Sequence, residues 1–216
     1  MKKVKNVLIL GDSYSTFRGC NPDGFAVYYS PDETEKTDVR ARSETWWARL
    51  EERAELNILE NNSWSGSTVG YTGYNGSDCS HTSSFIYRLG KLAERGFFEN
   101  EKPDTVLIFG GTNDSWANVP LGNVTFTDHS DEARRTVLPA ICCITRMLSE
   151  LLPKGRVIFI INTNIKPEIG EAIKLAAEHY GTEYIELKDI DKRNGHPTVK
   201  GMEDIANEVY AYITEA

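Results

Sequence analysis

The chain has 216 residues, of which 40% are hydrophobic. This length suffices for a sizeable core, so we expect a single domain over residues 1–216. Its 32 acidic residues outnumber the 24 Lys and Arg, which gives a net charge of −8. Nucleic acids and anionic membranes bind basic patches, so an acidic chain is expected to take neither as its main partner.

The N-terminal sequence is the observation that bears on the compartment. Met1–Lys5 is basic, like the start of a signal peptide, but the apolar run after it is too short for the hydrophobic region of one. We therefore expect a cytoplasmic protein, unless a signal peptide has been removed from the chain. No stretch is long and apolar enough to span a bilayer.

None of the four cysteines forms a Cys-x-x-Cys pair, so no metal or cofactor is expected. Cys142 and Cys143 are expected in the core, and a disulfide between Cys20 and Cys79 stays open.

The apolar run Val7–Leu10 leads directly into Gly11-Asp12-Ser13. Its length and composition are typical of a strand buried on both faces of a parallel sheet. Ser13 then follows at the carboxyl end of the strand, where open parallel sheets bind their ligands. On these residues alone, a helix-capping role for Asp12 or Ser13 remains an alternative. The long polar stretch over 17–45 comes next, and loops of this length are commonly functional or mobile.

Strands and helices alternate along the rest of the chain. Periodicity and turn residues predict a helix from about Ser43, a strand over 56–59, a helix over 84–95, a strand over 105–109, a helix ending near 152, a strand over 157–161, a helix over 167–180, a strand over 184–187 and a last helix over 198–213. Pro139 is expected at the start of its helix or at a kink. The alternation predicts a parallel sheet covered by helices on both faces.

Three strands of this sheet end in polar loops that hold Ser13, Gly66 and Asn113, and these ends should meet along one edge. His196-Pro197 stands just before the last helix. A serine hydroxyl needs a base such as histidine to become nucleophilic, and the oxyanion that forms needs fixed N–H donors. The backbone N–H groups of Ser13 and Gly66 and the side-chain amide of Asn113 are candidate donors. The alternatives are that Asn113 only caps a turn and that His196 only begins a helix.

The pattern resembles the SGNH, or GDSL, hydrolase superfamily. The resemblance rests on four blocks that occur in the family's order, namely Gly11-Asp12-Ser13-Tyr14-Ser15, Asn61-Asn62-Ser63-Trp64-Ser65-Gly66, Gly110-Gly111-Thr112-Asn113-Asp114 and His196-Pro197. It implies an α/β fold, a flavodoxin-like three-layer α/β/α sandwich with a five-stranded parallel sheet. It further implies metal-independent ester hydrolysis with Ser13 as nucleophile, His196 as base, and Gly66 and Asn113 as oxyanion donors.

The chain departs from the family before the histidine. The family usually carries Asp three residues before it, where this chain has Arg193, and arginine cannot accept a hydrogen bond from imidazole. Asp191 is the nearest replacement, with Asp189 behind it. A backbone carbonyl is the alternative, which would leave a Ser–His dyad in place of a triad.

These residues predict a serine esterase that forms an acyl-enzyme on Ser13. A short acyl group such as acetyl, carried on a carbohydrate, follows from what the superfamily often hydrolyses. Trp64 and Trp116 are candidates for a substrate platform, although large rings also commonly cover a core edge. A lysophospholipase or thioesterase of the same fold is one alternative, and a non-catalytic carbohydrate-binding protein on a degenerate hydrolase fold, suggested by Arg193, is another. The sequence leaves the oligomeric state open.

Overall fold

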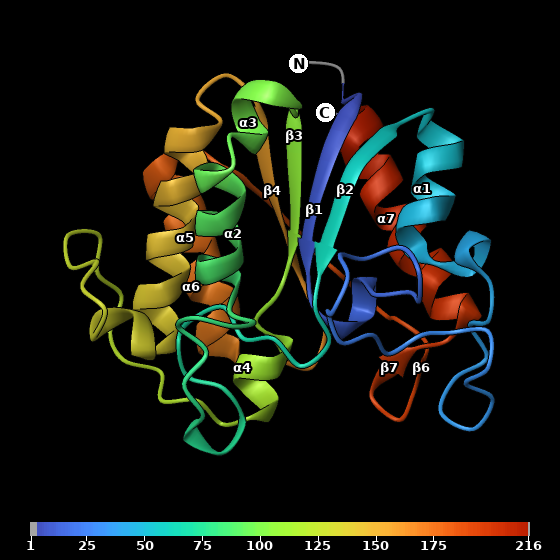
Figure 1. Ribbon diagram of the computed structural model, residues 1–216, viewed down its shortest axis with the longest axis horizontal. Helices are drawn as coiled ribbons and strands as arrows, with labels where there is room; N and C mark the ends of the chain where they lie inside the picture. Colours follow the sequence, from blue (N-terminus) through green and yellow to red (C-terminus); the bar gives the residue numbers. More distant parts are fainter. Residues whose placement is uncertain (1–3, 216) are drawn as a thin grey trace.

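The computed structural model describes residues 4–215, which form a five-stranded parallel sheet between two layers of helices (Figure 1). The strands are β1 (Asn6–Gly11), β2 (Asn57–Ser63), β3 (Thr105–Phe109), β4 (Arg156–Ile161) and β5 (Glu183–Glu186). Their order is β2-β1-β3-β4-β5, so the chain reverses its direction of travel across the sheet between β1 and β3. Such a switch point is where doubly wound sheets bind ligands.

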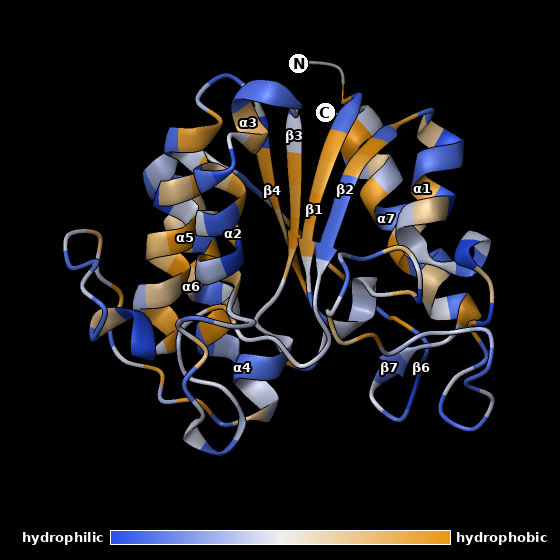
Figure 2. Ribbon diagram, in the orientation of Figure 1, coloured by the Kyte–Doolittle hydropathy of each residue, from blue (hydrophilic) through white to orange (hydrophobic). Residues whose placement is uncertain are grey.

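Two helical layers cover the sheet. On one face lie α2 (Phe85–Glu94), α5 (Val137–Leu151) and α6 (Pro167–Tyr180), and on the other lie α1 (Trp46–Ala54) and α7 (Val199–Glu215) (Figure 1). Alternate residues of β1 enter the two cores, with Leu8 and Leu10 on the first face and Val7 and Ile9 on the second. Each inner strand begins with a polar residue and is otherwise mainly apolar, whereas the edge strand β2 turns hydrophilic along its length (Figure 2).

The predicted fold is confirmed, with several differences in detail. Helix α1 begins at Trp46 rather than Ser43, because the Thr45 side chain caps it by accepting a hydrogen bond from the Ala48 N–H. Strand β2 continues to Ser63, past the predicted end at residue 59. Pro139 is the third residue of α5, where a missing N–H leaves no intrahelical bond unmade.

The sequence did not predict the shorter elements. These are α3 (Phe97–Asn100), α4 (Thr112–Trp116), a two-stranded antiparallel hairpin of β6 (Lys192–Arg193) and β7 (His196–Pro197), and single helical turns over 13–15, 42–44, 74–76 and 133–135. Both α4 and the hairpin lie beyond the carboxyl ends of the main strands (Figure 1). They are the elements that surround the predicted site.

The long 17–45 segment packs onto the hairpin side of the fold. Tyr29 and Val39 are fully buried. The Tyr29 hydroxyl donates to the Pro197 carbonyl at 2.9 Å, and the Asp38 carboxylate accepts from the Val199 N–H at 3.0 Å. The segment therefore supports the start of α7 and the hairpin before it.

All four cysteines are free thiols, so the disulfide left open between Cys20 and Cys79 is not formed. Cys142 and Cys143 are fully buried in α5, as expected. Among residues 4–215, no helix is both long and apolar enough to cross a lipid bilayer.

Candidate active site

The turn that carries Ser13, the predicted nucleophile, follows the end of β1, where Gly11 pairs with Ser63 of β2. A side chain on Gly11 would place its Cβ 2.6 Å from Ser63 Oγ, so only glycine fits the end of this strand. Asp12 then caps the turn over 13–15, because its carboxylate accepts the Tyr14 N–H at 3.0 Å. Asp12 thus has the capping role considered for it, and this turn directs the Ser13 hydroxyl toward His196.

Ser13 and His196 are in direct contact although 183 residues separate them: the distance from Ser13 Oγ to His196 Nε2 is 3.0 Å. The other ring nitrogen, Nδ1, lies 3.2 Å from the backbone carbonyl oxygen of Asn194. A carbonyl can only accept, so Nδ1 carries the hydrogen and Nε2 is left as the acceptor that faces the serine. This is the tautomer that a general base requires.

Aromatic rings enclose the imidazole. Tyr28 stacks on it at 3.6 Å between ring centroids, and Trp116 and Tyr14 lie at 5.4 and 5.5 Å. Burial lowers the pKa of His196 to about 4, the Asn194 carbonyl raises it and the charge of Lys192 lowers it further. The ring is therefore neutral at pH 7.

A tight turn presents His196. Asn194 and Gly195 have φ values of 53° and 78°, the left-handed pair that a two-residue hairpin turn needs. The Tyr14 hydroxyl donates to the Gly195 carbonyl at 2.5 Å, which joins the hairpin to the nucleophile turn. Asn194-Gly195 is a strong hairpin signal, so the sequence did contain a clue to this missed element.

The three candidate oxyanion donors are arranged around the same strand ends. Gly66 has a φ of 81°, and no atom lies within 4 Å of the position that a Cβ would occupy. Within the described chain, the N–H groups of Ser13 and Gly66 have no hydrogen-bond acceptor. Asn113 donates one amide hydrogen to the Ser67 carbonyl at 3.0 Å and accepts from the Tyr74 hydroxyl at 2.8 Å. Its amide is thereby fixed in orientation, with a second N–H still available.

The structure does not bring Asp191 to the imidazole. Its carboxylate accepts from the Thr198 hydroxyl, and its backbone carbonyl accepts from the Thr198 N–H at 3.1 Å. Nor does any other carboxylate of residues 4–214 hydrogen-bond to the His196 ring. Of the two alternatives that the sequence left open, the observed geometry matches the backbone carbonyl. In the same range, no three His, Cys, Asp or Glu side chains are grouped as metal ligands.

A buried arginine that sequence analysis missed supports these loops. Arg88 on α2 donates to the carbonyl of Gly11 at 3.0 Å and to Ser67 Oγ at 3.2 Å, and it also bonds both the carbonyl and the side-chain oxygen of Asn62. It thus ties the ends of β1 and β2 to the segment that carries Gly66. A single arginine within a helical pattern gives no sign of such a role.

Asp12 and Asp114 are buried beneath the site. Desolvation raises the pKa of Asp12 to about 7 and that of Asp114 to about 6. Both Asp114 oxygens accept from the Val69 N–H, at 3.1 and 3.0 Å. Asp114 therefore fixes the loop that leads from Gly66 into α2.

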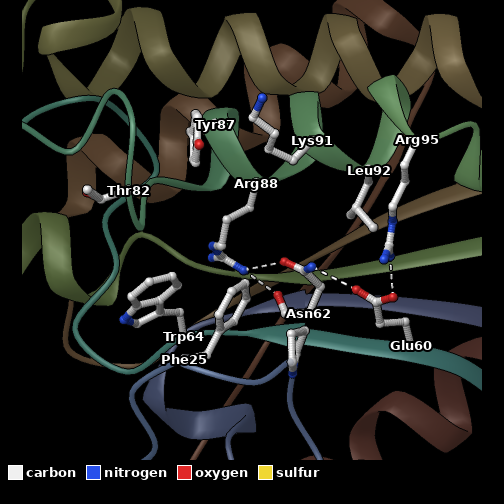
Figure 3. A pocket seen from close by; sticks show the side chains of 11 residues that line it. Phe25, Glu60, Asn62, Trp64, Thr82, Tyr87, Arg88, Lys91, Leu92 and Arg95 are labelled. Carbon is white, nitrogen blue, oxygen red and sulfur yellow. Dashed lines mark hydrogen bonds and ion pairs between the residues drawn. The ribbon is translucent and has the colours of Figure 1, made fainter.

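The two predicted platform residues lie in different surroundings. Trp116 is 42% exposed and stands beside the imidazole. Trp64 packs on Phe25 with ring centroids 4.3 Å apart, and both rings line a cavity of about 330 Å³ between the edge strand β2 and α2 (Figure 3). The cationic side chains Lys91 and Arg95 also line this cavity. Trp64 therefore lies in the wall of this cavity, and Trp116 lies beside the His196 imidazole.

Comparison with known proteins places the chain in a family. The family model described as GDSL-like Lipase/Acylhydrolase matches residues 5–213. A crystal structure from Bacteroides ovatus, named only as a GDSL-like lipase, is 36% identical with a TM-score of 0.90 and full coverage of both chains. A second, from Bacteroides uniformis and named in the same way, is 39% identical with a TM-score of 0.90, covering 99% of this chain and 97% of the other.

A more distant structure shares the fold only. It is a family two carbohydrate esterase from Clostridium thermocellum in complex with cellohexaose, 15% identical with a TM-score of 0.66, covering 100% of this chain and 65% of that one. No curated protein matches the chain. The family model and the two Bacteroides structures nevertheless span nearly the whole sequence, and they agree with the strand-end motifs and with the flavodoxin-like sheet. The chain belongs to the GDSL-like lipase/acylhydrolase family of SGNH hydrolases and is an ester hydrolase.

Proposed function

We propose that the protein is a serine esterase that works through a Ser13–His196 dyad. Ser13 Oγ attacks the ester carbonyl carbon while His196 Nε2 takes its proton. The carbonyl of Asn194 holds Nδ1–H and so fixes the tautomer, the role that Asp plays in a triad. The observation that carries this proposal is the 3.0 Å contact between Ser13 Oγ and His196 Nε2 on a ring whose Nδ1 faces a carbonyl.

The remaining steps use the same groups. The N–H groups of Ser13 and Gly66 and the free amide hydrogen of Asn113 stabilise the oxyanion. His196 gives its proton to the departing alcohol, which leaves an acyl group on Ser13. His196 then takes a proton from water, whose oxygen attacks the acyl-enzyme. Collapse of the second oxyanion breaks the bond to Ser13 Oγ and releases the acid, and His196 returns its proton to Oγ to restore the hydroxyl.

The substrate that we propose is a short acyl ester, such as acetate, on a carbohydrate. Exposed Trp116 stands beside the base, where it can contact the alcohol part of a substrate. The Phe25–Trp64 pair lines a cavity of ligand size, and Trp64 precedes Gly66 by only two residues. Trp116 beside the base and the cavity near Gly66 both lie close to Ser13. They favour a substrate whose alcohol part is long enough to reach beyond the ester group, as an oligosaccharide is. The distant Clostridium thermocellum structure shows that a carbohydrate esterase can have this fold.

Acetic acid release from acetylated oligosaccharides, with p-nitrophenyl acetate and p-nitrophenyl octanoate for comparison, tests the proposal. We expect hydrolysis of the acetyl esters, poorer hydrolysis of the octanoate, and labelling of Ser13 by a fluorophosphonate that is lost in Ser13→Ala. A preference for the octanoate would favour the lysophospholipase or thioesterase alternative. An unlabelled, inactive wild type would favour a carbohydrate-binding protein instead.

A further inference from the structure

Lys192 stands four residues before His196 and begins the hairpin that carries it. Its ammonium nitrogen lies 3.1 Å from Asn162 Oδ1, 3.2 Å from the Thr163 carbonyl oxygen and 2.6 Å from Thr163 Oγ1. A lysine ammonium has three hydrogens, and these contacts use all three. Both acceptor residues directly follow β4, so Lys192 fastens the hairpin to the carboxyl end of a central strand.

The same contact connects the two halves of the site. The Asn162 amide that accepts from Lys192 donates to Thr112 Oγ1 at 2.9 Å, and Thr112 immediately precedes Asn113. On its other side, the Lys192 ammonium lies 5.5 Å from the centre of the Tyr14 ring, whose hydroxyl bonds to Gly195. A chain of contacts therefore runs from Thr112, next to Asn113, through Lys192 and Tyr14 to the backbone of Gly195, next to His196.

The surroundings of Lys192 do not favour a charge. Its acceptors are all neutral, and no carboxylate of residues 4–214 forms an ion pair with it. Burial accordingly lowers the pKa of Lys192 to about 8. A half-buried cation without an anionic partner costs stability, so general packing alone gives no reason to place one here.

The charge of Lys192 also acts on the base in the direction opposite to that of a triad carboxylate. The titratable groups that face the imidazole from the neighbouring elements are the phenols of Tyr14, Tyr28 and Tyr29 and the ammonium of Lys192. Burial raises the pKa of all three phenols, so they stay uncharged at neutral pH. The lysine repels a proton on His196, and what it offers catalysis must therefore be geometric.

We propose that Lys192 is the positioning residue of the catalytic base: by fastening the 192–197 hairpin to the end of β4, it gives His196 the fixed placement that an orienting carboxylate provides in a triad. This inference rests on the proposed Ser13–His196 mechanism. It explains how a ring whose Nδ1 donates to a backbone carbonyl, and not to a carboxylate, keeps its alignment with the serine. An unfastened hairpin would let the ring drift, and a misplacement of about 1 Å can cost roughly 10²-fold in rate.

Two substitutions separate geometry from charge. Lys192→Met removes both the three hydrogen bonds and the charge, whereas Lys192→Arg keeps the charge but cannot reproduce the contacts of a compact ammonium. With p-nitrophenyl acetate we expect Lys192→Met to lower kcat by about 10²-fold with KM nearly unchanged. Its acid limb in the kcat/KM profile should move to higher pH, because the repelling charge is gone. Lys192→Arg should lose kcat while keeping the acid limb of the wild type.

Lys174→Met is the matched control, because Lys174 lies on α6 and pairs at the surface with Glu171 of the same helix and Glu186 of β5. Thermal unfolding of each variant shows whether it folds, and Lys192→Arg tests the geometry if Lys192→Met does not. Wild-type kcat in both Lys192 variants, or lower stability with an unmoved acid limb in Lys192→Met, would overturn the inference. Activity that survives in Ser13→Ala would instead overturn the proposed mechanism itself, and the inference with it.

Discussion

The two halves of the site are held in different ways. Ser13 and Asn113 follow the buried central strands β1 and β3 by two and four residues, at the point where the strand order reverses. His196 lies outside the main sheet, on a hairpin whose strands have two residues each. Strand ends and glycine turns therefore place the proposed nucleophile and oxyanion donors, whereas side chains distant in sequence place the proposed base.

The two halves differ in the interactions that hold the reacting atoms in place. A strand at the centre of a parallel sheet is bonded on both sides, so its end is a rigid support. The hairpin over 192–197, with strands of two residues each, has no neighbouring strands to support it. Hydrogen bonds from the side chains of Tyr14, Tyr29 and Lys192 hold it in place instead. We therefore expect substitutions in the first half to remove chemistry outright, and substitutions around the second half to act through alignment and pH.

The largest effects are expected at the two residues in contact. Ser13→Ala and His196→Ala should each lower kcat for p-nitrophenyl acetate by about 10⁴-fold or more, and the double variant should lose little beyond either single one. The reason is that neither group has a function without its partner. His179→Ala, on the outer helix α6, is the matched control. Additive losses in the double variant would show that the two residues act separately.

Asn113→Ala should have the next largest effect. Loss of one oxyanion donor typically costs about 10²- to 10³-fold in kcat, with KM much less affected. Steady-state kinetics with the same ester measures both constants, and Asn207→Ala on the surface of α7 serves as the control. A loss in KM alone would mean that Asn113 binds the substrate in its ground state and does not meet the oxyanion.

What the sequence could predict follows the same division. The sheet, the large helices and the placement of Ser13, Gly66 and Asn113 just after strand ends were predictable, because buried strands and the loops after them leave local patterns. His196 was predictable as a motif, but its hairpin was missed although Asn194-Gly195 signals one. Lys192 and Arg88 were not predictable, because a lone cation in a polar or helical segment looks the same whether or not the fold buries it.

Asp191 shows the limit of spacing as an argument. It was chosen for its nearness to His196 along the chain, yet the turn through Asn194 and Gly195 leaves its carboxylate beside Thr198. The role of the 17–45 segment also depends on tertiary contacts that the sequence does not reveal, because only the structure shows Tyr28 stacked on the His196 imidazole.

The pH dependence tests the surroundings of the base. Neutral imidazole is the active form, so activity should fall as the pH drops through the pKa of His196, which is about 4. The acid limb of kcat/KM should therefore lie near pH 4, well below the value of about 6.5 for a free histidine. A stopped assay of p-nitrophenol release, with circular dichroism at each pH to confirm folding, measures it. An acid limb near pH 6.5 would mean that His196 is solvated or paired with a carboxylate.

The smallest effect is expected at Asp191, and it bears most directly on the central claim that a backbone carbonyl orients the base. Replacing the orienting Asp of a triad by Asn costs about 10⁴-fold in kcat. Asp191→Asn keeps the size of the side chain and an oxygen acceptor for Thr198, so folding should be preserved. The decisive measurement is kcat of Asp191→Asn for p-nitrophenyl acetate at pH 7, beside wild type. We predict a value within about threefold of wild type, whereas a loss approaching 10⁴-fold would show that Asp191 completes a triad.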